Sequence, residues 1–211
     1  MATFIPSSSQ TTSTSASGTM TAIHDFYHRF SPPGATLTRS FIAGMVVAVA
    51  LGNAQSAITA DVLRAIPFVV PSAMTVQTMS VYITTGVSPG SGWLAIYENT
   101  SNNNLYPSGL LGFGGNFDLW TPAEISGGLQ LDKVLYPDRV YWAVHCSSGN
   151  TPGLRFIQNQ AMYPIYGVPD FTGISVGIQH NYTYTESPPD PFPAGASAST
   201  GVYPAIRILT Y

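Results

Sequence analysis

Two neighbouring stretches decide the fold: Val62-Leu-Arg-Ala-Ile-Pro-Phe-Val-Val70 and Met74-Thr-Val-Gln-Thr-Met-Ser-Val-Tyr-Ile-Thr-Thr85. The first is almost continuously apolar, which is typical of a strand buried on both faces. The second alternates apolar and polar residues, which predicts a strand with one buried face. Its apolar phase switches between Thr78 and Met79, as an extra residue in a β-bulge would require.

Working outward from these stretches, the chain continues as short apolar segments separated by turn-forming residues. These segments predict strands over 93–98, 110–118, 129–135, 139–148, 154–157, 174–178 and 203–211. The strands do not alternate with helical patterns, which excludes a parallel α/β sheet. The sequence therefore predicts an all-β fold, a jelly-roll-like antiparallel β-sandwich with an extended N-terminal arm.

Three local expectations follow from the same pattern. Leu129–Leu135 and Arg139–Ser148 should pair across Pro137-Asp138, and Asn99–Ser108 should form a polar turn. Residues 185–201, rich in Pro, Gly and Ala, should form a loop. A helix near 57–65 is an alternative, because four apolar residues there would share one helical face: Ile58, Val62, Leu63 and Ile66.

Charged residues make up only 8 % of the 211 residues, against roughly 25 % in typical soluble domains. The formal net charge of −3 with seven Lys and Arg disfavours nucleic-acid binding, which needs a basic patch. The 45 % hydrophobic content excludes a disordered chain. A surface so poor in like charges does little to repel copies of itself, which favours a subunit of an assembly.

The N-terminal region differs in composition from the rest. Residues 7–17 contain only Ser, Thr, Gln and Ala, so they cannot bury a core. We expect 1–34 to be an extended arm and 35–211 to be the β-sandwich domain. The apolar run Phe41–Gly52 is too short to span a bilayer and predicts a buried strand or an interface. The arm should contact neighbouring subunits through the apolar side chains of Phe4, Ile5, Phe26, Tyr27 and Phe30.

Catalytic and metal-binding patterns are weak. Cys146 is the one cysteine, and His145 beside it should point to the opposite face of a strand, so we expect a buried thiol. His24 and His28 have a spacing that would suit zinc on a helix, but Asp25 does not reproduce the zincin motif. No Gly-x-Ser-x-Gly motif is present. We therefore expect no catalytic residue, no metal and no cofactor.

Loop aromatics offer another function. Sugar-binding sandwiches use such rings as stacking platforms, and the candidates for a glycan contact are Trp120, Tyr106, Tyr163 and Tyr166. The alternative is that these rings pack on loops or in subunit interfaces, where Tyr and Trp are enriched. Trp93 and Trp142 alternate with small or apolar residues within strands and should lie in the core.

The order of segments resembles a family of small β-sandwich structural proteins of tailed bacteriophages and prophages. The resemblance spans roughly 62–211 and rests on these segments: Ala65–Pro71 leading into Met74–Gln77, Trp93–Glu98, Leu105–Leu111, Leu135–Val144, Pro191–Gly195 and Ile206–Leu209. Residues 1–50 have no counterpart in it. The family has no catalytic residues to transfer.

The resemblance implies a non-enzymatic virion protein, with a capsid decoration or cement role as the first hypothesis. A tail, fibre or baseplate component is the second, and a module that recognises cell-surface glycan is a third. A hydrolase would need a convergent acid pair or triad. The expected partners are the major capsid protein or tail subunits and other copies of this chain, with a trimer as one option. Neither nucleic acid nor a membrane is expected as a partner.

Overall fold

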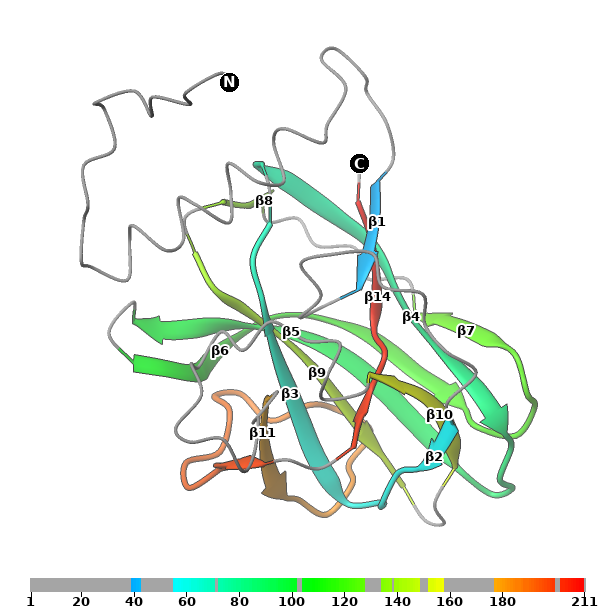
Figure 1. The fold of residues 1–211 in the computed structure, drawn as a ribbon. Helices are drawn as coiled ribbons and strands as arrows, with labels where there is room; N and C mark the ends of the chain where they lie inside the picture. The colour runs from blue at the N-terminus through cyan, green and yellow to red at the C-terminus, as the bar shows by residue number, and fades with distance from the viewer. Residues whose placement is uncertain are drawn as a thin grey trace, which may run out of the picture.

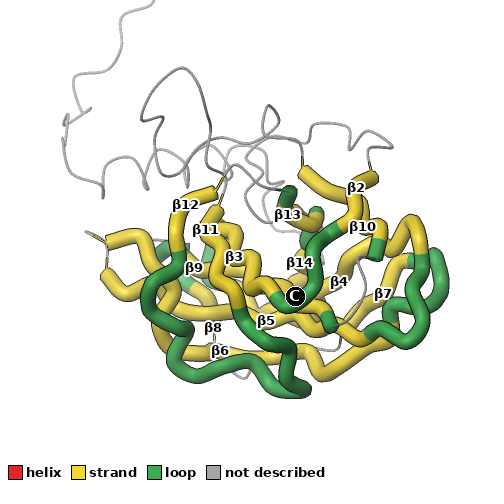
Figure 2. Tube along the Cα trace, turned by 90° about the horizontal axis from the view of Figure 1, so that it is seen from below, coloured by secondary structure: helices red, strands yellow, loops and turns green. Residues whose placement is uncertain are grey.

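The computed structural model describes residues 39–42, 55–70, 72–101, 104–127, 134–137, 139–148, 152–157, 177–199 and 202–210. These residues form strands and loops, and no helix occurs among them (Figure 2). The strands are β1 (Arg39–Ile42), β2 (Gln55–Ala57), β3 (Val62–Phe68), β4 (Met74–Thr85), β5 (Ser91–Ser101), β6 (Asn104–Asp118), β7 (Glu124–Gly127), β8 (Val134–Leu135), β9 (Tyr141–Ser147), β10 (Gly153–Ile157), β11 (Gly177–Asn181), β12 (Ser197–Ser199), β13 (Tyr203–Pro204) and β14 (Arg207–Thr210).

Two antiparallel sheets form a β-sandwich, which confirms the predicted fold class (Figure 1). One sheet has the order β1-β14-β4-β10-β13, with β2 paired to β10 and both β7 and β8 paired to β4. The other has the order β12-β11-β3-β9-β5-β6. The finer assignment to a jelly roll stays a prediction.

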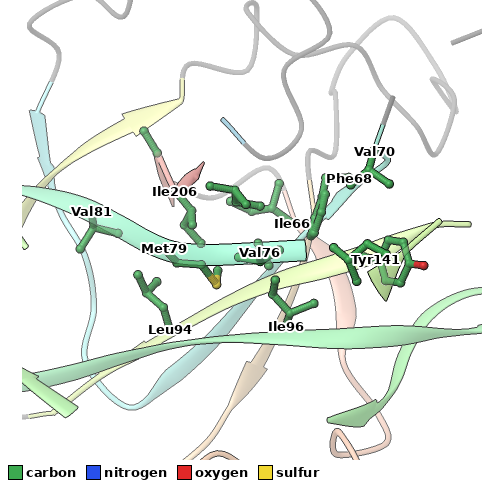
Figure 3. Packing of buried hydrophobic residues seen from close by; sticks show 14 of the residues in the cluster. Ile66, Phe68, Val70, Val76, Met79, Val81, Leu94, Ile96, Tyr141 and Ile206 are labelled. Carbon is green, nitrogen blue, oxygen red and sulfur yellow. The ribbon is translucent and has the colours of Figure 1, made fainter. Parts of the chain in front are cut away.

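The main core lies between the two sheets (Figure 3). It is built from alternate residues of strands in both sheets, as the period of two in a strand requires. The strands β3, β5 and β9 contribute from one side, and β4 and the C-terminal segment from the other. Its buried residues include Ile66, Phe68, Val76, Met79, Val81, Leu94, Ile96, Tyr141, Ile206 and Ile208.

The predicted bulge in β4 is present. Leu209 pairs with Thr78, whereas the next residue of β14, Thr210, pairs with Val76, so Gln77 has no partner of its own in the ladder. The buried positions of β4 change accordingly from Met74 and Val76 to Met79, Val81 and Ile83. The extra residue thus explains the phase switch seen in the sequence.

A second core covers the outer face of the six-stranded sheet. Trp93, Tyr97 and Trp142 point to this face and are completely buried. The long loop between β11 and β12 runs over the outer face of this sheet (Figure 2). Its Phe192, which is 4 % exposed, packs among these side chains. The prediction that Trp93 and Trp142 are core residues is therefore confirmed, although their core lies outside the space between the sheets.

The alternative of a helix near 57–65 is wrong. The chain instead ends β2 at Ala57, turns, and enters β3 at Val62. Asp61 makes the turn with a positive φ of 57°, and its backbone N–H donates to the Ser147 carbonyl at 2.9 Å. Val62, Leu63 and Ile66, which would have shared a helical face, are buried on both faces of β3, and Ile58 is buried in the segment before it.

The predicted pairing of 129–135 with 139–148 is also wrong for the residues that the structure describes. Leu135 of β8 pairs with Met74 of β4, whereas β9 pairs with β3 and β5 in the other sheet. The reason is burial: all seven residues of β9 are buried, so this strand needs a neighbour on each side. A hairpin across the Pro137-Asp138 turn would supply a neighbouring strand on one side only.

The polar turn expected over 99–108 is mostly strand. The strand β5 continues to Ser101, β6 begins at Asn104, and their pairing is interrupted by several register shifts. The Asn99 side chain stabilises this irregular hairpin, because its Oδ1 accepts from the Tyr106 N–H at 3.0 Å and from Trp142 Nε1–H at 2.9 Å. β6 is an edge strand of the six-stranded sheet.

Several expectations fall outside the described residues: the arm over 1–34, the pair His24 and His28, and the part of the apolar run after Ile42. The beginning of that run lies in β1, which pairs with β14. Within the described part of the chain, no helix is long and apolar enough to cross a bilayer.

Candidate functional site

Trp120 is the most exposed large apolar residue that the structure describes, with 53 % of its surface accessible. It follows Leu119, which is completely buried and fixes the loop. The Val87 N–H donates to the Leu119 carbonyl at 2.8 Å, and the Leu119 N–H donates to the Gly90 carbonyl at 3.0 Å. A Cβ at Gly86 would overlap the Trp120 carbonyl, so the two loop backbones are in close contact. Trp120 is thus an exposed indole on a well-anchored loop.

Tyr106, a second candidate for a glycan contact, lies in the second core. Its hydroxyl donates to the Pro193 carbonyl at 2.6 Å and accepts from the Ala196 N–H at 2.9 Å. Its ring meets Phe192 edge-on at 6.0 Å between centroids. These contacts hold the loop between β11 and β12 against β6.

The structure does not bring the candidate aromatics together. Tyr106 lies near the start of β6 and Trp120 lies just beyond its end, separated by roughly 45 Å of extended chain at ~3.3 Å per residue. Tyr163 and Tyr166, the other two candidates, lie outside the described residues, as do the five apolar arm residues.

Sequence reasoning missed a group of polar and aromatic side chains on the outer face of the eight-stranded sheet. It consists of Ser80 and Tyr82 of β4, Glu124 of β7, Arg155 of β10 and Arg207 of β14, and we call it the outer patch. Arg155 stacks over the Tyr82 ring at 4.1 Å from the centroid, within the range of a cation–π contact. The alternation of β4 predicts that Tyr82 points outward, but it does not reveal its neighbours.

Glu124 connects the polar part of the outer patch. Its Oε1 accepts from the Ser80 hydroxyl at 2.6 Å and from Arg207 Nη1–H at 2.8 Å. The side chains of Arg207 and Glu124 are 45 % and 43 % exposed, so this ion pair contributes little to stability. Together with Arg155, the pair places three charged groups on this face.

Two more exposed apolar residues lie at β8. Val134 is 44 % exposed and Tyr136 is 49 % exposed. The Arg139 guanidinium lies over the Tyr136 ring at 5.7 Å from the centroid, and the Tyr136 N–H donates to the Tyr141 hydroxyl at 2.8 Å. The backbone of this corner is thus fixed, while the Tyr136 ring and Val134 face solvent.

The cysteine and histidine of β9 are separated as predicted. Cys146 is buried in the second core, whereas His145, its neighbour in the strand, points to the other face. Burial raises the pKa of the Cys146 thiol to about 12 and lowers the pKa of His145 to about 3, with the Arg64 charge adding to the second effect. The two side chains cannot form a thiolate–imidazolium pair.

No group of three or more His, Cys, Asp or Glu that could hold a metal ion occurs in the described part of the chain. Two of the described carboxylates hold loops: Asp61 Oδ1 accepts from the Tyr184 N–H at 2.8 Å, and Asp190 Oδ1 accepts from the Leu110 N–H at 3.1 Å. Both contacts secure the loop over the second core. No protein-family model and no curated protein matches this chain.

Proposed function

We propose that this chain is a non-enzymatic structural protein of a bacteriophage virion, with capsid decoration or cementing as its role. The sandwich is displayed on the particle, and the arm over 1–34 attaches it to the major capsid protein and to neighbouring copies. The sequence resemblance over 62–211 motivates the phage assignment. The structure supports it through one feature, the character of the sandwich surface.

That feature is a charge-poor sandwich that exposes aromatic rings on fixed backbone. With 8 % charged residues, the chain has little like-charge repulsion to keep copies apart. Trp120, Tyr136 and Tyr82 are 53 %, 49 % and 37 % exposed. Tyr, Trp and Arg are enriched in protein interfaces, and two of these rings carry an arginine against them. This surface favours association with other proteins.

Attachment is proposed to use the apolar arm residues Phe4, Ile5, Phe26, Tyr27 and Phe30. Burial of apolar surface contributes about 25 cal/mol per Å². A symmetric oligomer presents several arms at once, so multivalency would increase the affinity without any new contact. The Ser- and Thr-rich stretch over 7–17 would act only as a spacer between the apolar segment that contains Phe4 and the one that contains Phe26.

The experiment compares three versions of the protein on particles assembled without it. The full chain should bind, and a version lacking residues 1–34 should fold but not attach. A third version replaces 7–17 by Gly and Ser at constant length and should bind like the full chain. Cryo-electron microscopy then shows where the bound density lies. Full occupancy by the version without 1–34 would refute attachment through the arm, and density only on tail or fibre subunits would refute the decoration role.

A second candidate is a receptor-binding module that recognises cell-surface glycan. The observation that favours it is Trp120, an indole that is 53 % exposed on a loop held by two backbone hydrogen bonds. A fixed exposed ring suits stacking against a sugar. Trp120→Ala should abolish binding on a glycan array, whereas Tyr136→Ala, which removes a similarly exposed ring, should not. An array without any signal for the full chain would exclude this candidate.

A further inference from the structure

Three polar side chains lie inside the sandwich where β3 and β9 pair. Arg64 and His145 are direct partners in the antiparallel ladder. Ser147 lies two residues farther along β9, and therefore on the same face. Arg64 is 4 % exposed, and His145 and Ser147 are completely buried. We call these three residues the inner polar cluster.

Four buried polar atoms of the inner polar cluster lack hydrogen-bond partners. Arg64 Nε, both ring nitrogens of His145 and the Ser147 hydroxyl are buried with no partner. Buried polar groups are almost always satisfied by protein or by a bound molecule, and an orphaned group costs about 1–3 kcal/mol. Several unsatisfied polar atoms on neighbouring residues indicate that an ion or molecule binds between them.

The positive charge of Arg64 is also uncompensated. Its Nη1 donates to the carbonyls of Thr59 at 2.8 Å and Val62 at 3.5 Å, which are neutral acceptors. The ion pair that is present in the described residues joins Arg207 to Glu124 instead. A guanidinium in the interior without an anionic partner is unfavourable.

The wall opposite the inner polar cluster is apolar. Along β9 the inward side chains pass from Tyr141 and Ala143 in the main core to His145 and Ser147. Along β4 they pass in the same direction from Met79 and Val81 to Ile83. Ile83 belongs to a third buried cluster with Ile58, Leu119 and Leu154. The one hydroxyl on this side that interacts with Arg64 electrostatically, among the described residues, is that of Tyr203, and it donates to the Ser199 carbonyl at 3.4 Å. The apolar residues of the wall offer the inner polar cluster no partner.

We propose that the inner polar cluster binds a small monovalent anion of chloride size. The sign follows from the guanidinium charge, which a water molecule would leave uncompensated. The donors are the Arg64 Nε–H, the Ser147 hydroxyl and the N–H of neutral His145. The size follows from enclosure, since none of the three residues is more than 4 % exposed. This site does not depend on the proposed virion function.

The first experiment measures the melting temperature of the full chain in chloride and in gluconate at constant ionic strength. Chloride should raise the melting temperature with a saturating dependence, because a ligand that binds only the folded state stabilises it by mass action. Ser147→Ala removes one donor and should require several-fold more chloride for the same rise. Ser80→Ala is the matched control: it removes a buried serine hydroxyl that donates to Glu124, and its response to chloride should equal that of the unaltered chain.

The second experiment locates the anion directly. Crystals grown in bromide should show an anomalous peak within hydrogen-bond distance of Arg64 Nε and Ser147 Oγ. The proposal is overturned if the peak is absent and water fills the site, or if the melting temperature is the same in chloride and gluconate. It is also overturned if Ser147→Ala responds to chloride as the unaltered chain does, because the anion then binds elsewhere.

Discussion

Replacing Phe192 by alanine should destabilise the chain by about 3 kcal/mol and open the second core. Phe192 is 4 % exposed and meets Tyr97 edge-on at 5.4 Å and Tyr106 at 6.0 Å. Truncation of a buried Phe to Ala costs roughly 3–5 kcal/mol. We take the lower end because Phe192 lies in a loop, which can move to fill part of the space. For a domain stable by ~5–15 kcal/mol, the loss is large.

The effect should be visible in tryptophan fluorescence as well as in urea unfolding. The loop that carries Phe192 also accepts hydrogen bonds from Trp93 Nε1–H at Thr185, 2.9 Å, and from the Tyr97 hydroxyl at Pro189, 2.6 Å. When the loop loosens, Trp93 and Trp142 should meet water and their emission should shift to longer wavelength. The measurement uses a Trp120→Phe background, because Trp120 is 53 % exposed and would add a solvent-like signal.

Tyr136→Ala is the control for this measurement, since it removes an aromatic ring that is 49 % exposed. It should change stability by no more than about 0.5 kcal/mol and leave the emission maximum unchanged. The reasoning is refuted if Phe192→Ala behaves like this control. In that case the loop would not contribute to the burial of the two tryptophans.

Three further predictions concern buried groups. Burial and the Arg64 charge lower the pKa of His145 from 6.5 to about 3, so between these pH values the unfolded state binds a proton that the folded state does not. In chloride-free buffer, the free energy of unfolding should therefore fall as the pH drops below about 6.5, by up to ~1.4 kcal/mol per pH unit. The urea midpoint of His145→Gln should depend less on pH than that of the unaltered chain. Burial raises the pKa of Cys146 to about 12, so a thiol reagent should modify it in urea and leave the folded chain almost unreacted; rapid modification without urea would contradict its burial. Gly177→Ala should lower the free energy of unfolding by more than about 2 kcal/mol in a urea titration, because its Cβ would overlap the Ala65 carbonyl and lie 2.8 Å from the Tyr203 ring. Gly109→Ala is the control and should be nearly neutral, since nothing lies within 4 Å of its Cβ. Equal effects of the two substitutions would count against the close approach of β11 to β3.

The strands that could be predicted are those whose burial is evident from the pattern of apolar residues within the strand itself. The almost continuous apolar run of Val62–Phe68, interrupted by Arg64, predicted a strand buried on both faces, and the alternation of Met74–Thr85 predicted both a strand and its bulge. Partners could not be predicted, because pairing depends on residues far away in the chain. Leu135 precedes a turn signal, Pro137-Asp138, that favours pairing with the nearby β9, but it pairs with Met74 in the other sheet.

The second core was hidden for a similar reason. Trp93 and Trp142 could be predicted as buried, but a strand apolar on both sides does not reveal what covers each side. The covering segment is a Pro-rich loop whose composition predicts exposure to solvent. It is held by hydrogen bonds between residues about ninety positions apart, such as those from Trp93 Nε1–H to the Thr185 carbonyl and from the Tyr106 hydroxyl to the Pro193 carbonyl. Tyr106 therefore looked like an exposed loop aromatic in the sequence and holds the loop in the structure.

The outer patch shows where on the molecule the few charged residues of this chain gather. A low content of charge predicts a protein that associates, yet it does not say through which surface. Tyr82 comes from β4, Glu124 from β7 and Arg207 from β14, and no local pattern connects them. The antiparallel registers bring them together, since Tyr82 pairs with Glu124 and Ser80 pairs with Arg207. A chain with only seven Lys and Arg thus places two arginines beside one exposed tyrosine and one glutamate, which makes this face the first to examine for a protein partner.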